Sequence, residues 1–309
     1  MVISILIFLL SLALLTFSSD RFIGAAEKIG LGFGISPFIV GVTVVAFGTS
    51  LPELMTSIVS VYHGSSEIVA GNVVGSNITN ILLVVGVSAV ITGDMIIKRD
   101  LIGEDLPMMM ASALLLWFAL RDSYFSVAES VLFIFALIIF LWSSLKEDDH
   151  DKSEIQPKVS WVEYIYSLFG ATGIYFGATY TVSSISDISG ALGINPAIVS
   201  LTALALGTSL PEVVVSVAAC KRNLAGMALG NVIGSNVFNT YAVMAIPSLI
   251  GPLTIPPAIY EFSLPFMVAV SLLFTIICIS KKVSLWQGCL LLIFYGYFMI
   301  DLFSQGYVR

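Results

Sequence analysis

Two glutamates stand out because each ends a nearly identical motif inside a long apolar stretch. Glu53 closes the sequence Val-Ala-Phe-Gly-Thr-Ser-Leu-Pro-Glu, and Glu212 closes the sequence Leu-Ala-Leu-Gly-Thr-Ser-Leu-Pro-Glu. An ionisable side chain in a segment that crosses a membrane costs from about 2.5 to about 17 kcal/mol, depending on its surroundings. Neither stretch has a Lys or Arg near its centre. A bound cation is therefore the expected partner, in preference to two protonated carboxyl groups that hydrogen-bond within a packed core.

The residues just before each glutamate predict a break in the helix. Proline removes a backbone donor and glycine weakens the helix, so backbone carbonyls should be released beside the carboxylate. Ca²⁺ prefers six to eight oxygen ligands from carboxylates, carbonyls and amides, and added hydroxyls suit ions of smaller charge such as Na⁺. Hydroxyl groups can also simply bond their own helix backbone. The candidate hydroxyls belong to Thr49, Ser50, Thr208 and Ser209.

A second motif, Gly-Asn-x-x-Gly-Ser-Asn-x-x-Asn, also occurs twice. It places Ser76 and Asn80 four residues apart, on one face of a helix, and repeats this with Ser235 and Asn239. Its glycines suit either close helix packing or a site. Amides inside a membrane must find polar partners, so Asn80 and Asn239 join the candidate site.

The composition describes the elements that must hold these residues. The chain has 309 residues, of which 58% are hydrophobic and 11% charged, against roughly 25% charged in soluble domains. This excludes an ordinary soluble enzyme. A transmembrane helix needs about 20 apolar residues, and the apolar runs predict ten spans: 2–19, 36–61, 67–91, 106–120, 124–145, 161–186, 196–219, 225–250, 258–280 and 285–303.

The second copy of each motif follows the first at one constant offset, which carries Glu53 to Glu212 and Asn80 to Asn239, with five predicted spans between equivalent positions. An odd number of spans gives the two halves opposite orientations, as in many secondary transporters. We therefore predict an all-α membrane protein with ten transmembrane helices, arranged as two inverted five-helix repeats with broken helices at a central ion site. The repeats are 1–145, with its motifs at 43–80, and 161–309, with its motifs at 202–239; residues 146–160 form a linker.

The basic residues predict the orientation in the cell membrane. Alternate loops carry eleven of the thirteen Lys and Arg residues, and only Arg121 and Arg309 fall on the other side. Because basic loops stay in the cytoplasm, both termini are expected to be extracellular and the linker 146–160 cytoplasmic.

The paired motifs resemble the two alpha repeats of the cation/calcium exchanger superfamily, and specifically those of prokaryotic, archaeal-type sodium/calcium exchangers. The resemblance covers essentially the whole chain. It implies that Glu53 and Glu212 are shared Ca²⁺ and Na⁺ ligands and that Asn80 is the central amide. Hydroxyls or carbonyls implied to complete the sites come from Ala46, Thr49, Ser50, Ser76, Ala205, Thr208, Ser209 and Ser235.

The same resemblance implies a function, an antiporter that exchanges Na⁺ for Ca²⁺ by alternating access and moves net charge. Potassium-dependent relatives carry Asp where this chain has Asn239, which favours potassium independence. By the same likeness, the first spans of the halves, Val2–Ser19 and Trp161–Ser186, slide over a fixed core.

Other functions stay open from the residues alone. A proton/calcium exchanger is the nearest, because buried glutamates can bind protons; a potassium-dependent exchanger and a cation channel are further alternatives. An enzyme is not expected, since His63 and His150 lie in predicted loops and no metalloprotease motif occurs. The expected partners are the transported ions Ca²⁺ and Na⁺ and the lipid bilayer. We expect no cofactor, nucleic acid or obligate protein partner.

Overall fold

The computed structural model describes residues 1–32, 46–97, 103, 105–146, 159–221 and 225–306. Its described part is helical apart from two short strand pairs. Each predicted span coincides with one or more helices, which confirms the all-α fold. Residues 36–45 of the second span, which include the start of the first motif region, and 147–158 of the predicted linker lie outside the described residues.

The first half begins with a helix much longer than predicted. The first span was expected to end at Ser19, but α1 runs from Val2 to Gly32. Charged residues end an apolar run without ending a helix, because Ala, Glu, Lys and Arg are good helix formers. The elements that follow are α3 (Ala46–Thr49), α4 (Leu51–Tyr62), α5 (Glu67–Thr79), the π-helical turn η2 (Asn80–Val84), α6 (Val85–Thr92), β1 (Met95–Ile96), α7 (Asp105–Ala119), the short 3-10 turn η3 (Leu120–Asp122), β2 (Tyr124–Phe125) and α8 (Val127–Lys146).

The second half repeats this order. Its first helix, α9 (Trp161–Leu192), also outruns its predicted end at Ser186. The bounds of α3, α4 and η2 recur in α11, α12 and η5 at the offset that relates Glu53 to Glu212, so the repeat in the sequence is also a repeat in structure. The elements are α10 (Pro196–Val199), η4 (Ser200–Leu204), α11 (Ala205–Thr208), α12 (Leu210–Lys221), α13 (Ala225–Phe238), η5 (Asn239–Val243), α14 (Met244–Ser248), β3 (Leu253–Thr254), η6 (Ile259–Ser263), α15 (Leu264–Ile279), β4 (Lys282–Val283) and α16 (Leu285–Gly306).

Several helices have the length and composition of membrane spans. Within the described residues five continuous helical stretches qualify: Val2–Phe22, Glu67–Thr92, Pro196–Lys221, Ile259–Ile279 and Leu285–Leu302. Large apolar side chains such as Trp142, Phe169 and Ile300 are exposed on the outside of the protein. Apolar helices with exposed apolar side chains are typical of a membrane protein.

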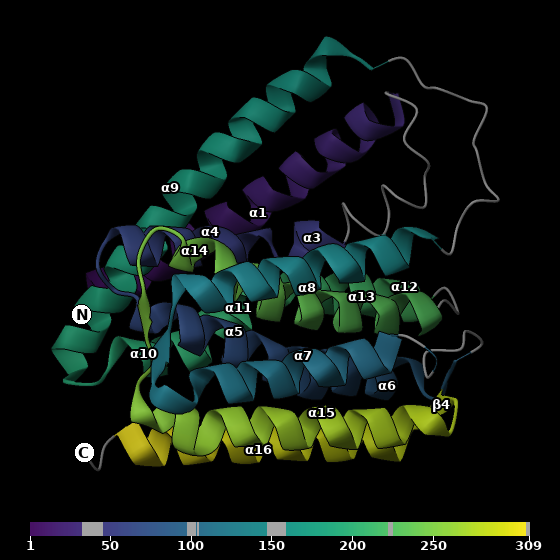
Figure 1. Cartoon of the computed structure of the whole chain (residues 1–309). Helices are drawn as coiled ribbons and strands as arrows, with labels where there is room; N and C mark the ends of the chain where they lie inside the picture. The colour runs from purple at the N-terminus through teal and green to yellow at the C-terminus, as the bar shows by residue number, and fades with distance from the viewer. Residues whose placement is uncertain (33–45, 98–102, 104, 147–158, 222–224, 307–309) are drawn as a thin grey trace.

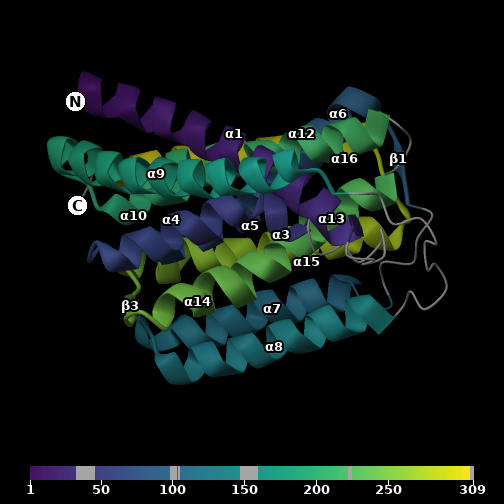
Figure 2. The same cartoon turned by 90° about the horizontal axis from the view of Figure 1, so that it is seen from above.

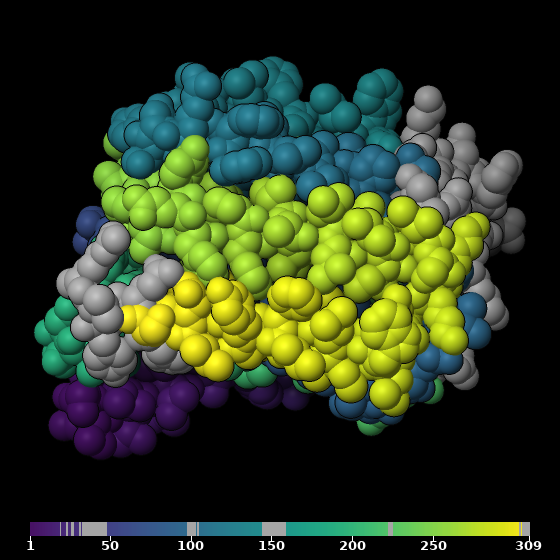
Figure 3. Space-filling view, turned by 90° about the horizontal axis from the view of Figure 1, so that it is seen from below, coloured from purple at the N-terminus to yellow at the C-terminus, as the bar shows by residue number. Residues whose placement is uncertain are grey.

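The helices form two groups in space. In Figure 1, α1 and α9 lie side by side and run obliquely to α7, α8, α13, α15 and α16, which are nearly parallel to one another. Figure 2 shows α1 and α9 on one side of the helical body and α7 and α8 on the opposite side. From below, α15 and α16 cover the near face (Figure 3). The first helices of both halves therefore pair with each other, outside the remaining helices.

Two short strand pairs join the halves. β1 pairs with β4, with Met95 opposite Val283, and β2 pairs with β3, with Tyr124 opposite Thr254. The repeat offset carries Met95 to Thr254 and Tyr124 to Val283, so one pair is the repeat image of the other. Each pair takes one strand from each half. Backbone hydrogen bonds thus hold the two halves together at two equivalent places.

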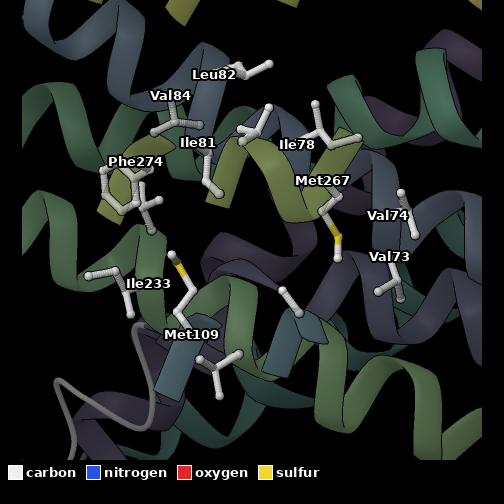
Figure 4. Packing of buried hydrophobic residues seen from close by; sticks show 14 of the residues in the cluster. Val73, Val74, Ile78, Ile81, Leu82, Val84, Met109, Ile233, Met267 and Phe274 are labelled. Atoms are coloured by element: carbon white, nitrogen blue, oxygen red, sulfur yellow. The ribbon is translucent and has the colours of Figure 1, made fainter. Parts of the chain in front are cut away.

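The core consists of two separate clusters. The larger one packs α5, η2, α7, α13 and α15 together; Figure 4 shows Val73, Val74, Ile78, Ile81, Leu82, Val84, Met109, Ile233, Met267 and Phe274 within it. The smaller one joins α1 and α9 to α4, α5, α10 and η4, through residues that include Leu12, Leu15, Ile174, Val182 and Leu204. The α1–α9 pair is thus attached to the body by its own apolar layer.

The α1–α9 interface depends on a very close approach of the two backbones. A Cβ atom added to Gly177 of α9 would lie 2.8 Å from the backbone N and Cα atoms of Leu15 in α1. Polar contacts add to the packing. Ser11 and Thr181 share a buried hydrogen bond of 2.9 Å, and the Lys28 ammonium donates to the Glu163 carboxylate at 2.8 Å near the other end of α1. The two helices therefore behave as one packed unit.

This interface generates a prediction. Gly177→Ala should destabilise the protein by about 1–3 kcal/mol, because the added methyl group forces the two backbones apart. Gly190→Ala on the same helix is the matched control, since nothing lies within 4 Å of a Cβ atom there and alanine is the better helix former. The measurement is thermal unfolding of the purified variants in detergent. Equal unfolding temperatures for the two variants would contradict the tight interface.

Candidate cation-binding site

The break in each repeated motif is a single residue. Ser50 separates α3 from α4 and Ser209 separates α11 from α12, with ψ angles of 8° and 4° in place of the helical value. Pro52 and Pro211 follow two residues later, and their nitrogens cannot bond the carbonyls of the fourth residue before them. The carbonyls left without that helical donor are those of Gly48 and Gly207, at the centre of the motif.

The carbonyls predicted as ligands are those of Ala46 and Ala205, which are not the two that the prolines leave without a helical donor. The Ala205 carbonyl keeps a helical hydrogen bond from the Ser209 nitrogen at 3.1 Å, so the break does not release it. A carbonyl oxygen has a second lone pair, and Ala205 itself is fully buried. Ala46 is the first residue of α3, and its side chain lies outside what the structure describes.

The two carboxylates are buried together. Glu53 and Glu212 have no solvent exposure, and the charge of one acts on the other. The surrounding helices contribute no Lys, Arg or His over residues 46–62, 67–92, 205–220 and 225–248. Two carboxylates in a nonpolar setting without a basic partner repel each other and require another source of positive charge.

Hydroxyl groups reach each glutamate from the opposite half. Thr208 and Ser209 face the Glu53 carboxylate, and Thr49 and Ser50 face that of Glu212. The two broken segments therefore lie across from each other. From its own half, Glu53 receives the Ser76 hydroxyl, which donates to Oε1 at 3.5 Å.

Thr49 of the first half makes a related contact with the second half. Its hydroxyl lies 3.4 Å from the Ser235 hydroxyl and 3.5 Å from Oδ1 of Asn231, so α3 of the first half touches α13 of the second. Asn80 and Asn239 lie one helical turn beyond Ser76 and Ser235 and begin the π-helical turns η2 and η5. Single π-turns inside helices are frequent at functional sites.

Two further asparagines hold the broken helices in place. The Asn72 amide nitrogen donates to the Glu53 backbone carbonyl at 3.0 Å and to the Ser57 hydroxyl at 3.0 Å. In the other half the Asn231 amide donates to Ser216 at 3.4 Å. These two asparagines and two serines are not among the predicted site residues. The sequence did contain a signal for these residues, because the repeat offset also carries Ser57 to Ser216.

Many buried oxygens at this site have no hydrogen-bond partner. Within the described part of the chain these include Oε2 of Glu53, both carboxylate oxygens of Glu212 and the Oδ1 atoms of Asn80 and Asn239, together with the hydroxyls of Ser50 and Ser209. Buried polar atoms are normally paired, so a concentration of unpaired oxygens around two carboxylates marks a place for a cation. The described residues hold no cluster of three His, Cys, Asp or Glu side chains. Oxygen donors alone suit Na⁺ and Ca²⁺ better than softer metals.

The structure thus brings most predicted site residues into one region. Contacts connect the glutamates with the hydroxyls of both halves, and all of these side chains are buried. Asn80 and Asn239 are fully buried on the adjoining turns. Their role as ion ligands, and that of the hydroxyls and carbonyls, stays a prediction.

Comparison with known proteins shows the family to which the chain belongs. The family model described as "sodium/calcium exchanger protein" matches residues 3–146 and 162–303. An uncharacterized membrane protein of Methanocaldococcus jannaschii is 37% identical over 93% of this chain and 94% of its own length. Sodium/calcium exchanger MaX1 of Methanosarcina acetivorans is 31% identical over 97% of this chain and 99% of its own.

A solved structure has the same fold. The sodium-calcium exchanger NCX_Mj, soaked with Na⁺ and Sr²⁺, superposes with a TM-score of 0.67 at 34% identity, over 96% of this chain and 97% of that one. The match therefore extends over both halves of this chain. On the family model, the relatives and the fold together, the chain belongs to the sodium/calcium exchanger family.

Proposed function

We propose that this chain exchanges Na⁺ for Ca²⁺ across the cell membrane by alternating access, without a requirement for K⁺. One observation carries the proposal. Two buried carboxylates, Glu53 and Glu212, face hydroxyls of opposite halves and retain unpaired oxygens, with no basic side chain on the surrounding helices.

The charge of the site suits both ions. Two ionised carboxylates carry about two negative charges, which one Ca²⁺ neutralises. Several Na⁺ ions can do the same if hydroxyls, carbonyls and amides share them. The proposed ligands are Glu53 and Glu212 with Ala46, Thr49, Ser50, Ser76, Asn80, Ala205, Thr208, Ser209, Ser235 and Asn239. Because the ions use the same oxygens, they compete, and only a neutralised site crosses the membrane at low cost.

The two-group architecture supplies the moving part. α1 and α9 contact each other closely and attach to the body through the smaller cluster. In that cluster the Leu12 side chain of α1 fills the space beside Gly207 in the broken segment α11. We propose that the α1–α9 unit slides across the body and opens the site to one side at a time. The repeats 1–145 and 161–309 then stay joined through the strand pairs.

The neutral amide of Asn239 supports independence from K⁺. Its nitrogen and oxygen are both buried and unpartnered among the described residues, which also group no third acidic side chain with Glu53 and Glu212. Three Na⁺ per Ca²⁺ would also move one net charge. A tenfold Na⁺ gradient then supplies about 4 kcal/mol, and 100 mV adds about 2.3 kcal/mol, enough to hold a Ca²⁺ gradient of about four decades.

Proton/calcium exchange is a second candidate, and one observation favours it. Glu53 and Glu212 act on each other without a basic partner, and proton binding reduces the charge of such a pair, as metal binding does. The orientation of the protein in the membrane is a separate part of the proposed function. From the distribution of basic residues over alternate loops we propose that the linker 146–160 faces the cytoplasm and that both termini lie outside.

Transport in liposomes tests the counter-ion. Vesicles loaded with Na⁺ and diluted into Na⁺-free medium should take up ⁴⁵Ca²⁺, because outward Na⁺ flow drives Ca²⁺ through the shared site. Uptake should be the same when K⁺ is replaced by choline, and an inside-positive potential should speed it if three Na⁺ leave for each Ca²⁺ that enters, because net positive charge then moves outward. Uptake that follows a pH gradient and ignores Na⁺ would make the protein a proton/calcium exchanger.

The ligand assignment has its own test. Glu53→Gln and Glu212→Gln should each abolish Na⁺-driven Ca²⁺ uptake, because a neutral amide cannot balance the charge of the ion, while membrane insertion and folding stay intact. Glu129→Gln is the control, since that carboxylate accepts hydrogen bonds from Ser126 at the start of its own helix α8 and its loss should leave uptake unchanged. A double Gln variant that still exchanges would overturn the assignment.

A further inference from the structure

A pair of asparagines crosses the boundary between the two halves. The Asn77 amide of α5 donates to the Asn236 backbone carbonyl at 3.4 Å, and the Asn236 amide of α13 donates to the Asn77 backbone carbonyl at 3.3 Å. Their exposed fractions are 3% and 2%, so neither amide can turn to solvent. The repeat offset that carries Glu53 to Glu212 also carries Asn77 to Asn236. They are repeat images of each other, bonded to each other.

The bonds that extend from this pair are not symmetric. The Asn80 amide nitrogen donates to Oδ1 of Asn236 at 3.0 Å. The repeat image of that bond would run from the Asn239 amide nitrogen to Oδ1 of Asn77. Within the described part of the chain both of these atoms are buried without a partner. One of the two equivalent hydrogen bonds is therefore made, and the donor and the acceptor of the other are both unpaired.

The hydrogen bond from Asn80 to Asn236 determines which atom of the Asn80 amide is available to an ion. With its nitrogen held by Asn236, the Asn80 amide cannot rotate freely, and its Oδ1 is left as a buried acceptor without a partner. An oriented amide oxygen is a good ligand for a hard cation. The Asn239 amide has neither atom held, so its oxygen is not oriented. At any moment the crossed pair presents one amide oxygen rather than two.

Neighbours of the pair differ between the halves. The Asn77 amide nitrogen also reaches the Thr240 hydroxyl at 3.1 Å and the Met267 sulfur at 3.7 Å. The position equivalent to Thr240 in the first half is Ile81, which offers no hydroxyl to Asn236. The Asn77 amide therefore has a hydroxyl partner that the Asn236 amide lacks.

We infer that Asn77 and Asn236 are positioning residues for the ion-site amides of the opposite half. Asn236 orients Asn80, Asn77 orients Asn239, and the two bonds alternate between the outward-facing and inward-facing states. The alternation rests on the proposed function, because alternating access gives a protein built from two inverted repeats two oppositely facing states. An interaction made in one half is then exchanged for its image in the other half.

A double-mutant cycle on Ca²⁺ binding tests the positioning role. Asn236→Leu should weaken Ca²⁺ binding by about tenfold in the otherwise unaltered protein, and by less than about twofold when Asn80 is already Ala, because directly coupled residues are not additive. The readout is calorimetric titration of the purified protein with Ca²⁺ in the absence of Na⁺, which does not depend on the counter-ion. Ser112→Ala is the control, since that buried hydroxyl bonds its own helix at the Met109 carbonyl.

The opposing results are distinct. The same loss of affinity in both backgrounds would overturn the positioning role and leave a structural one. If Asn236→Leu does not fold, Asn236→Ala takes its place in the same cycle, and the criterion is unchanged. Failure of Na⁺-driven uptake would overturn the proposed counter-ion without affecting this binding cycle.

Sided transport tests the alternation. In vesicles of uniform orientation, Asn236→Leu and Asn77→Leu should raise the apparent KM for Ca²⁺ at opposite faces, because each removes the orienting bond of one state. A purely structural role would raise it equally at both. Equal effects of each variant at both faces would overturn the alternation and leave the result of the binding cycle to decide the positioning role.

Discussion

The burial of two carboxylates without a basic partner is the constraint on which the rest of the structure depends. Glu53 and Glu212 are fully buried and act on each other. Such a pair becomes tolerable in a membrane when a dense set of oxygen donors surrounds it and a metal cation or a proton reduces its charge. This explains why buried polar residues gather on α3, α4, α5 and their repeat images, while α7, α8, α15 and α16 are mostly apolar.

Each half of the repeat provides oxygen donors to the carboxylate of the other half. Hydroxyls from each half face the carboxylate of the other, and the strand pairs and the Asn77–Asn236 pair cross the same boundary. Neither half contains a complete site. The two halves also differ in side chains beside the glutamates. Thr56 bonds the Pro52 carbonyl at 2.8 Å beside Glu53, whereas Val215 stands at the equivalent position beside Glu212.

The division into a body and an α1–α9 unit follows from packing chemistry. The body is held by a large apolar cluster, by the strand pairs and by the polar network at the site. The α1–α9 unit is held internally by backbone contact at glycines and externally by one apolar layer. Apolar layers without directional bonds allow sliding at lower cost than hydrogen-bonded interfaces do. The helices that hold the polar site can thus stay in place while their cover moves.

Local chemistry allowed the sequence alone to predict where helices lie, though not the ends of α1 and α9, and to identify the two broken motifs, the internal repeat and the family. Apolar runs, prolines and an odd number of spans act within a segment or through simple counting. Long-range packing decided the rest. That Thr208 faces Glu53 and that Asn80 is held while Asn239 is not depend on how the helices of the two halves meet. Residues from equivalent positions of the two repeats come into contact only when the helices of both halves pack together, and no local pattern in the sequence encodes that distance.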